Sequence, residues 1–492
     1  MEKILYSNTN IFDGNKIHTN SSLVISDSKI VGFGEASNFD ANSFDREIDC
    51  KGMLITESFI DSHTHLLSYA SYLSKPHIDY GEINSKSDLI HQIESIVNDS
   101  NEYWIRIFGL NINENSLNIN KNDLDQISTN VPIVITLDSL HGNLLNTKAL
   151  DIIGITEYSN EPNGVTFDRQ INNGKLSGYI FEGEYLIDEH IPKSSISDLT
   201  YKMEHISQIY EDNGYTLIND ASINNDYKKF ELLMNITSTN HFVPKIIFMP
   251  GFAHLSEFSR ERLHYNNTIG SLRIGHCKIM LTSSSGKSVP NFETLSNQIN
   301  DSHRAGFPVA IHAVDNLSVK VAIQAISANP FENDRIEHAS ELYDEDIQNI
   351  QKNNIHISTH PSFIFERGDS YINDTNQLDL NSLYRIGSLI NSGITVGYSS
   401  DAPVSSVNAC MGIYANLTRC TRLGKSLNIS EKVSIANTLK MLTTYNKTIT
   451  NSEGSKSIKI GHDTKMLLID MDINNIDKNV LNNVNSSIKW IN

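Results

Sequence analysis

The amino-acid sequence predicts an α/β protein whose centre is a (β/α)8, TIM-like barrel. From about residue 214 onward, short apolar runs alternate with longer helix-like stretches, and this alternation is typical of a parallel sheet covered by helices. Seven such runs occur there, and an eighth ends at His63 and His65. Eight strands close a barrel of this kind. Several runs also end in a histidine or an aspartate, the position from which such barrels present catalytic side chains.

The two ends of the chain predict a small β-sandwich domain, formed by residues 1–55 together with 455–492. Polar turns separate short strand-like runs at 4–6, 23–26, 29–32 and 465–470. Nothing in these runs looks catalytic.

We expect residues 56–66 and 211–454 to form the barrel. Residues 67–210 are expected to be an insertion after the first strand that covers the barrel mouth and sets specificity. This segment is rich in Asn and Ser, and it carries no internal repeat, phosphate loop or cofactor fingerprint. The seven later strands are predicted at 216–220, 245–249, 276–281, 308–312, 334–338, 355–360 and 395–401.

An amphipathic helix over residues 430–445 is predicted to close the barrel. Ser430 is the expected N-cap, because its hydroxyl can accept a hydrogen bond from the first helical turn. Helical spacing places four apolar residues on one side: Val433, Ala436, Leu439 and Leu442.

The composition indicates a globular protein with a large core. Hydrophobic residues make up 39% of the chain and charged residues 20%. The formal net charge of −19, with no Lys and Arg cluster, argues against nucleic acid as a partner. The four cysteines form no CxxC pair and read as reduced thiols, the N-terminus has no signal core, and no run reaches the length of a membrane span. We therefore expect a cytoplasmic protein with no membrane partner.

The pair His63 and His65 predicts a metal site at the end of the first strand. Alternate residues of a strand point to the same face, so both imidazoles project together. Imidazole is the commonest metal ligand among side chains. With 18 histidines in 492 residues, a chance His-x-His remains the alternative.

Three more residues at predicted strand ends can ligate a metal: His312, His338 and Asp401. Each has a structural alternative. Either histidine could be a hydrogen-bonded core residue, with Glu337 or Arg335 as a neighbouring partner of His338. Asp401 could cap a helix, since it precedes Ala402-Pro403. Taken together, four imidazoles and a carboxylate at strand ends are what two zinc-like ions require.

Lys278 lies within a predicted strand, where a buried ammonium is costly. Carboxylation of its amine by CO₂ would convert it into an anionic ligand able to bridge two ions. Pairing of an unmodified lysine with a nearby carboxylate remains the alternative.

The ordered motifs resemble the metal-dependent amidohydrolase superfamily, and specifically its YtcJ-like branch, amidohydrolase family three. Residues 59–65 resemble the signature of the first strand. Several segments are similar to the branch's insertion: 124–125, 131–134, 141–146, 149–150 and 176–182. The later motifs follow in the expected order: 214–216, the Lys278 strand, 311–313, 335–339 and 400–404.

The resemblance implies a role for each of these residues. His63, His65 and Asp401 would hold one divalent ion, His312 and His338 a second, and carboxylated Lys278 would bridge them. Zn is the first expectation for the metal, with Mn or Fe as alternatives. Substrate contacts are implied for the insertion residues His141, Asn146 and Glu182, with carbonyl polarisation as a further catalytic role of His141.

The chain departs from the family pattern at several points. Glu57-Ser58 replace Pro-Gly before the first strand, and Thr282-Ser283 replace Asp-Gly after Lys278. The seventh strand ends in His360 where Gln is typical, so we expect His360 to contact substrate. All six predicted metal ligands are present.

The implied reaction is hydrolysis of a non-peptide C–N bond, of the amide or cyclic amide type, in a small molecule. A metal-bound hydroxide attacks, while Asp401 acts as general base and then as general acid. One alternative is a mononuclear aminohydrolase (a deaminase), with an ion on His63, His65, His312 and Asp401. Another is a catalytically degenerate barrel that acts as a binding protein. A homodimer is a family-level expectation.

Overall fold

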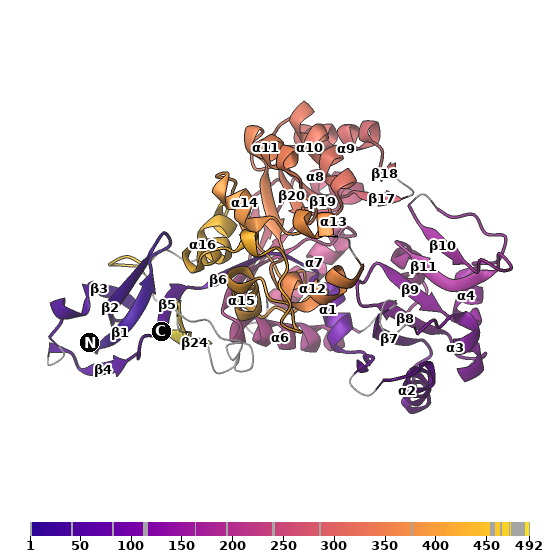
Figure 1. Cartoon of the computed structure of the whole chain (residues 1–492), viewed down its shortest axis with the longest axis horizontal. Coiled ribbons are helices and arrows are strands. Elements are labelled where there is room, and N and C mark those ends of the chain that lie inside the picture. Colours follow the sequence, from indigo (N-terminus) through magenta and orange to yellow (C-terminus); the bar gives the residue numbers. More distant parts are fainter. Residues whose placement is uncertain are drawn as a thin grey trace. The chain divides into compact units, whose positions relative to one another are not determined.

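The computed structural model describes most of the chain (Figure 1). The described residues are 2–40, 43–80, 83–111, 117–162, 164–192, 195–238, 242–284, 287–374, 377–452, 458–462, 465–471, 473 and 488–491. The chain divides into two compact units. The first unit combines Met1–Leu66 with Met203–Asn492, and the second unit is Leu67–Lys202.

Both ends of the chain contribute to one seven-stranded sheet of the first unit, and Figure 1 shows both termini beside it. Its strands are β1 (Lys3–Phe12), β2 (Ile17–Ser26), β3 (Lys29–Glu35), β4 (Arg46–Asp49), β5 (Leu54–Glu57), β23 (Met466–Ile469) and β24 (Ile488–Ile491). The order is β24-β23-β5-β1-β2-β3, with β4 paired to β1. Leu23, Ile55 and Leu468 belong to its buried apolar cluster. The structure records a single sheet here, and part of the predicted 455–492 segment lies outside the described residues.

Two five-stranded sheets form the centre of the first unit, and each of the eight predicted runs contains one of their strands. The first sheet holds β14 (Thr268–Ile269), β15 (Leu272–Ile274), β13 (Lys245–Phe248), β12 (Tyr215–Asp220) and β6 (Phe59–Thr64), in that order. The second holds β16 (Cys277–Met280), β19 (Val309–Ala313), β20 (Arg335–His338), β21 (His356–Thr359) and β22 (Val396–Tyr398). Apart from β14, neighbouring strands run parallel. The short strand β15 was not predicted.

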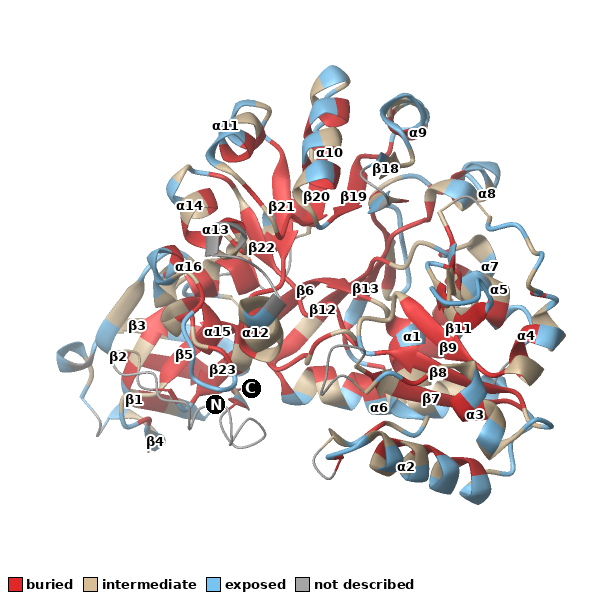
Figure 2. Ribbon diagram, turned by 45° about the vertical axis from the view of Figure 1, so that its right-hand side comes forward, coloured by how far each residue is buried: buried red, intermediate tan, exposed pale blue. Residues whose placement is uncertain are grey.

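Helices connect these parallel strands and expose one face (Figure 2). They include α7 (Tyr227–Thr237), α9 (Phe292–Arg304), α10 (Asn316–Ala328), α11 (Asp344–Lys352) and α12 (Ser362–Asp374). Helix α9 buries Leu295 and Ile299, which lie four residues apart on one side. Asp226, Asn291 and Asp315 cap the starts of α7, α9 and α10 by accepting hydrogen bonds from backbone amides of the first turn.

The predicted helix over 430–445 is broken in the structure. A short 3₁₀ turn at Ile429–Glu431 precedes helix α16 (Ile435–Lys440), which continues through the π-helical turn η6 (Met441–Tyr445) into α17 (Asn446–Ile449). The prediction of Ser430 as N-cap is therefore wrong. Ser434 is the cap instead, because its extended backbone lets its hydroxyl accept a hydrogen bond from Asn437 N.

The second unit is built on its own five-stranded sheet. Its strands, in sheet order, are β10 (Thr166–Arg169), β11 (Leu176–Phe181), β9 (Gly142–Leu145), β8 (Ile133–Leu137) and β7 (Ile105–Leu110). The unit ends within helix α6 (Ile196–Asp212), because its last residue is Lys202, whereas the sequence suggested an insertion that continues to residue 210.

No helix among the described residues combines the length and apolar character that crossing a membrane requires.

Arg335 is a fully buried cation that connects three parts of the first unit. Its Nε donates to Glu337 Oε1 at 2.5 Å, beside it on β20. Its Nη2 donates to Ser62 O of β6 at 2.9 Å, and its Nη1 donates to Ile449 O of α17 at 3.0 Å. The guanidinium therefore neutralises Glu337 and satisfies two carbonyls that would otherwise be buried without a partner.

Arg335→Met is expected to lower the free energy of unfolding by about 3–5 kcal/mol, because it leaves the Glu337 carboxylate buried and uncompensated. Chemical denaturation followed by circular dichroism measures this change. The matched control is Arg304→Met, which removes an exposed arginine paired with Asp301, and it should cost no more than about 1 kcal/mol. Equal losses for the two variants would contradict the assigned role of Arg335.

Candidate metal centre

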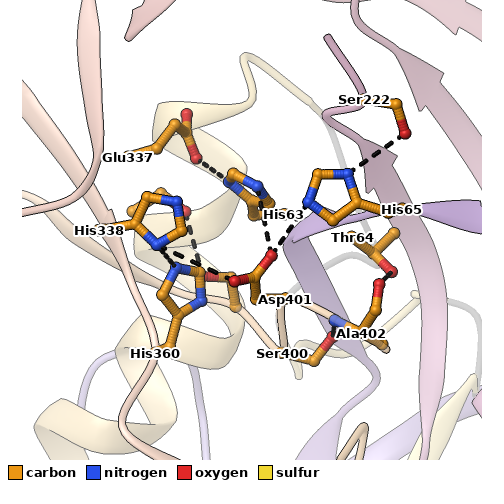
Figure 3. A network of polar contacts seen from close by, with 12 residues as sticks. His63, Thr64, His65, Ser222, Glu337, His338, His360, Ser400, Asp401 and Ala402 are labelled. Carbon is orange, nitrogen blue, oxygen red and sulfur yellow. Dashed lines mark hydrogen bonds and ion pairs between the residues drawn. The ribbon is translucent and has the colours of Figure 1, made fainter. Parts of the chain in front are cut away.

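Metal-competent side chains gather where the parallel strands of the first unit end. Two overlapping groups of three residues stand out, and within each group the ligand atoms lie within 4.8 Å of one another. The groups are His63, His65 and Asp401, and His63, His338 and His360. Figure 3 shows the Asp401 carboxylate between His63 and His65 on one side and His338 and His360 on the other. The structure thus brings together residues that are more than 330 positions apart in the sequence, at the shared end of parallel strands.

His63 is completely buried and held at both ring nitrogens. Its Nδ1 lies 2.5 Å from Glu337 Oε2, and its Nε2 lies 3.5 Å from Asp401 Oδ1. Burial, followed by the nearby Lys278 amine, lowers the pKa of His63 well below its usual value, so the ring is neutral. A proton on Nδ1, donated to Glu337, leaves the lone pair of Nε2 facing the cluster.

Glu337 was considered only as a possible partner of His338, and its contact with His63 was missed. The signal was present in the alternation of Arg335 and Glu337 on one strand face. Sequence alone does not reveal which strand this face opposes.

His65 completes the first group with a weaker hold. Its Nε2 lies 3.1 Å from Asp401 Oδ1, and its Nδ1 lies 3.2 Å from Ser222 Oγ. Ser222 follows β12 and was not predicted. The ring centroids of His63 and His65 lie 5.1 Å apart, which agrees with the pair that their spacing along the strand predicts.

Asp401 is fixed by hydrogen bonds that it and the preceding residue donate to strand β6. Its amide donates to His63 O at 2.9 Å, and the preceding Ser400 donates through its amide and hydroxyl to Asp61. Asp401 adopts φ = 58°, a left-handed conformation that a non-glycine residue rarely takes and that often marks functional sites. Burial alone would raise the pKa of Asp401, but His360, His63 and His65 outweigh it and hold that pKa far below its usual value.

His338 and His360 form a second contact pair in the cluster. His360 Nε2 lies 2.7 Å from His338 Nδ1, and His338 also has a left-handed backbone with φ = 70°. Among the described residues, no group hydrogen-bonds to the buried Nε2 atom of His338. The ring of His312, at the end of β19, lies 4.3 Å from that of His338.

Lys278 lies on β16 with its amine directed at this cluster. Its Nζ is 3.5 Å from His63 Nε2. Burial lowers the pKa of Lys278 to about 8, although Glu337 and Asp401 act in the opposite direction. The structure therefore places Lys278 with the predicted ligands.

The three predicted insertion residues lie in the second unit. His141 Nδ1 is 3.1 Å from Glu182 Oε1, and Glu182 has φ = 56°. A substrate role for this pair stays a prediction. Asn146 is buried, and its amide bonds only to backbone: it caps α4 (Thr147–Ile153), accepts from Ile133 N and donates to Ser128 O and Val131 O. With its donors and acceptor occupied in this way, Asn146 stabilises the fold, and a substrate contact for it stays a prediction.

The donor set suits a divalent transition metal. Several neutral imidazoles and one ionised carboxylate converge, and imidazole nitrogen and carboxylate oxygen are ligands of zinc and similar ions. The Nε2 atom of His338 carries either a lone pair or a proton, and it has no hydrogen-bond partner among the described residues. A cation would give a lone pair on His338 Nε2 a partner and would be attracted by the Asp401 carboxylate.

The chain is similar to several known proteins in sequence or in fold. YtcJ of Bacillus subtilis (strain 168), whose name assigns it to the amidohydrolases, is 23% identical over 466 residues, spanning 87% of this chain and 85% of that protein. The N-substituted formamide deformylase of Arthrobacter pascens is 23% identical over 473 residues, spanning 86% and 85%. A metal-dependent hydrolase from Pyrococcus horikoshii OT3 shares the fold, with a TM-score of 0.72, 20% identity, and coverage of 96% of this chain and 98% of that one.

The resemblance predicted from the sequence is confirmed by a family model. The model described as the amidohydrolase family matches residues 46–491, nearly the whole chain. The protein is therefore an enzyme of the amidohydrolase family.

Proposed function

We propose that this protein is a metal-dependent hydrolase of a non-peptide C–N bond in a small amide or cyclic amide. The observation that supports this most directly is the convergence of His63, His65, His338 and Asp401 from the ends of three strands. The similarity to an N-substituted formamide deformylase favours an amide-type substrate.

We further propose that the two central sheets are halves of one closed (β/α)8 barrel. Hydrogen bonds at two places between the edges of the two sheets support this. At one, Lys278 N of β16 donates to Pro250 O after β13 at 2.8 Å. At the other, Asn446 Nδ2 of α17 donates to Ile60 O of β6 at 2.5 Å and to Tyr398 O of β22 at 2.7 Å. The small β domain and the second unit would then be additions to this barrel.

Two divalent ions are proposed, with zinc as the first candidate. His63, His65 and Asp401 would hold one ion, His312 and His338 would hold the other, and Lys278 would lie between them. When bound, such ions lower the pKa of water and polarise a carbonyl group. The remaining steps depend on the protein's own residues.

Asp401 is the proposed general base and general acid. A carboxylate can accept a proton from the attacking water, and this one lies among the proposed ligands, 3.1 Å from His65 Nε2. It would then deliver this proton to the departing nitrogen. The backbone bond to His63 O fixes the carboxylate beside the ligands, so no rearrangement of the loop is needed before the proton transfer.

Carboxylation of Lys278 would reconcile its position with cation binding. An ammonium 3.5 Å from the His63 lone pair would repel a metal ion at the same place. If the neutral amine attacks CO₂ and loses a proton, the product is an anion with two oxygen donors. Glu337 would remain paired with Arg335 and His63, so it does not compete for this role.

Metal analysis tests the centre itself. We expect close to two zinc or manganese ions per chain, loss of amide hydrolysis after chelation, and recovery when metal is added back. A panel of N-acyl amines, N-acyl amino acids and cyclic amides supplies the assay. Fewer than about one bound transition metal per chain would contradict the two-metal proposal.

Asp401→Asn is expected to reduce kcat by about 10²–10⁴-fold, because the amide cannot accept the proton. Asp226→Asn is the matched control. Asp226 caps α7, and asparagine caps helices equally well, so activity should stay at the wild-type level. Full activity of Asp401→Asn would contradict the proton-transfer role of Asp401, whereas wild-type protein that hydrolyses none of the panel would favour the degenerate binding-protein alternative.

Lys278 modification separates the two-metal proposal from the mononuclear aminohydrolase. Protein equilibrated with ¹³C-bicarbonate should give one carbamate resonance in ¹³C NMR spectra. Lys278→Met should remove this resonance, whereas Lys229→Met, which replaces an amine that donates to Asn224 O, should not. If wild-type protein binds a single ion and gives no carbamate resonance, the mononuclear alternative is favoured.

A further inference from the structure

His360 lies directly after β21, in the interior of the metal-ligand cluster, and is completely buried. Its Nε2 is 2.7 Å from His338 Nδ1, and its Nδ1 is 2.8 Å from Ser399 Oγ. We propose that His360 is a positioning residue that holds His338 in the tautomer protonated on Nδ1, which leaves the Nε2 lone pair of His338 free for a metal ion. This inference rests on the proposed function and replaces the predicted substrate contact of His360.

The hydrogen bonds of Ser399 determine which atom is the donor in each hydrogen bond of His360. Its hydroxyl donates to Thr359 O, a carbonyl that can only accept, at 2.9 Å. A hydroxyl has one proton and two lone pairs. Because Ser399 donates its proton to Thr359 O, Ser399 Oγ is the acceptor in its contact with His360. The proton of this contact therefore lies on His360 Nδ1.

The proton on His360 Nδ1 determines the next contact. A neutral imidazole carries a single ring proton, so His360 Nε2 is then an acceptor. It must receive a hydrogen bond, and His338 Nδ1 is the atom that lies 2.7 Å away.

The opposite direction would place a buried proton where nothing accepts it. If His360 donated to His338 Nδ1, the proton of His338 would move to Nε2, which has no partner among the residues that the structure describes. A buried N–H without an acceptor costs about 1–3 kcal/mol. A lone pair at the same atom is available to a cation.

The short distance also argues against both nitrogens binding the same ion. Ligands at about 2.0–2.1 Å from a tetrahedral zinc are separated by roughly 3.3 Å. The observed 2.7 Å is a hydrogen-bond distance. His360 is held in place by Phe363, whose ring stacks on the imidazole with centroids 5.1 Å apart.

Zinc affinity tests this role in the full-length protein. The variants are His360→Leu, which removes the acceptor, and His360→Gln, whose side-chain oxygen can accept from His338 Nδ1. We expect His360→Leu to weaken binding of one zinc ion by about 10–100-fold, measured by competition with a chromophoric chelator. His360→Gln should restore the affinity to within a few-fold of wild type.

His356→Leu is the matched control, because His356 is a buried histidine at the opposite end of the same strand. Its zinc affinity should equal that of wild type. An equal loss in both leucine variants would indicate a general structural effect and would overturn the inference.

The tautomer can be read directly in the wild-type protein without metal. In protein labelled with ¹⁵N-histidine, solid-state NMR should show a protonated Nδ1 and an unprotonated Nε2 for His338, assigned by its absence in His338→Gln. A proton on Nε2 would overturn the inference. If the wild-type protein binds zinc and His360→Leu binds it with the same affinity, this inference is contradicted and the proposed function is not. If the wild-type protein binds no metal, the proposed function is contradicted as well.

Discussion

The contact between Asp401 and His63 is the constraint on which the centre depends. The Asp401 amide donates to His63 O, while its carboxylate lies 3.5 Å from His63 Nε2 and 3.1 Å from His65 Nε2. One backbone bond and two side-chain contacts therefore join the first and last parallel strands. The same residue links the strands and completes the ligand group, so the geometry of the site follows from the way the first unit folds.

A buried network below the ligands supports this arrangement. Arg335 holds Glu337, and Glu337 holds His63 Nδ1, so a single cation orients a ligand through a carboxylate. Asp61 supports the other side by accepting hydrogen bonds from Ser400 and from His63 N. Burial raises the pKa of Asp61 to about 6, against the effect of these hydrogen bonds. Such interactions hold ligands in one orientation before any ion arrives, which lowers the entropy lost on binding.

The backbone conformation of two residues at the site has a free-energy cost of its own. His338 and Asp401 both adopt positive φ angles, a conformation that costs roughly 1–3 kcal/mol for residues other than glycine. The surrounding strands and hydrogen bonds compensate for it. His338 is the last residue of β20 and Asp401 lies three residues after β22, where a sharp change of backbone direction turns the side chain toward the cluster.

The sequence by itself determined the strands, the order of the ligand motifs and the family, because apolar runs ending in His63, His312, His338 and Asp401 are local patterns. It also identified Lys278 from the cost of burying an ammonium. Ser434 and Asn146 each cap a helix by accepting from an amide three positions ahead, but several residues near a helix start can act as caps, and only the folded backbone shows which one does. The pairing of His360 with His338 joins the ends of two strands, and such a contact forms only when the packed structure brings the two rings together.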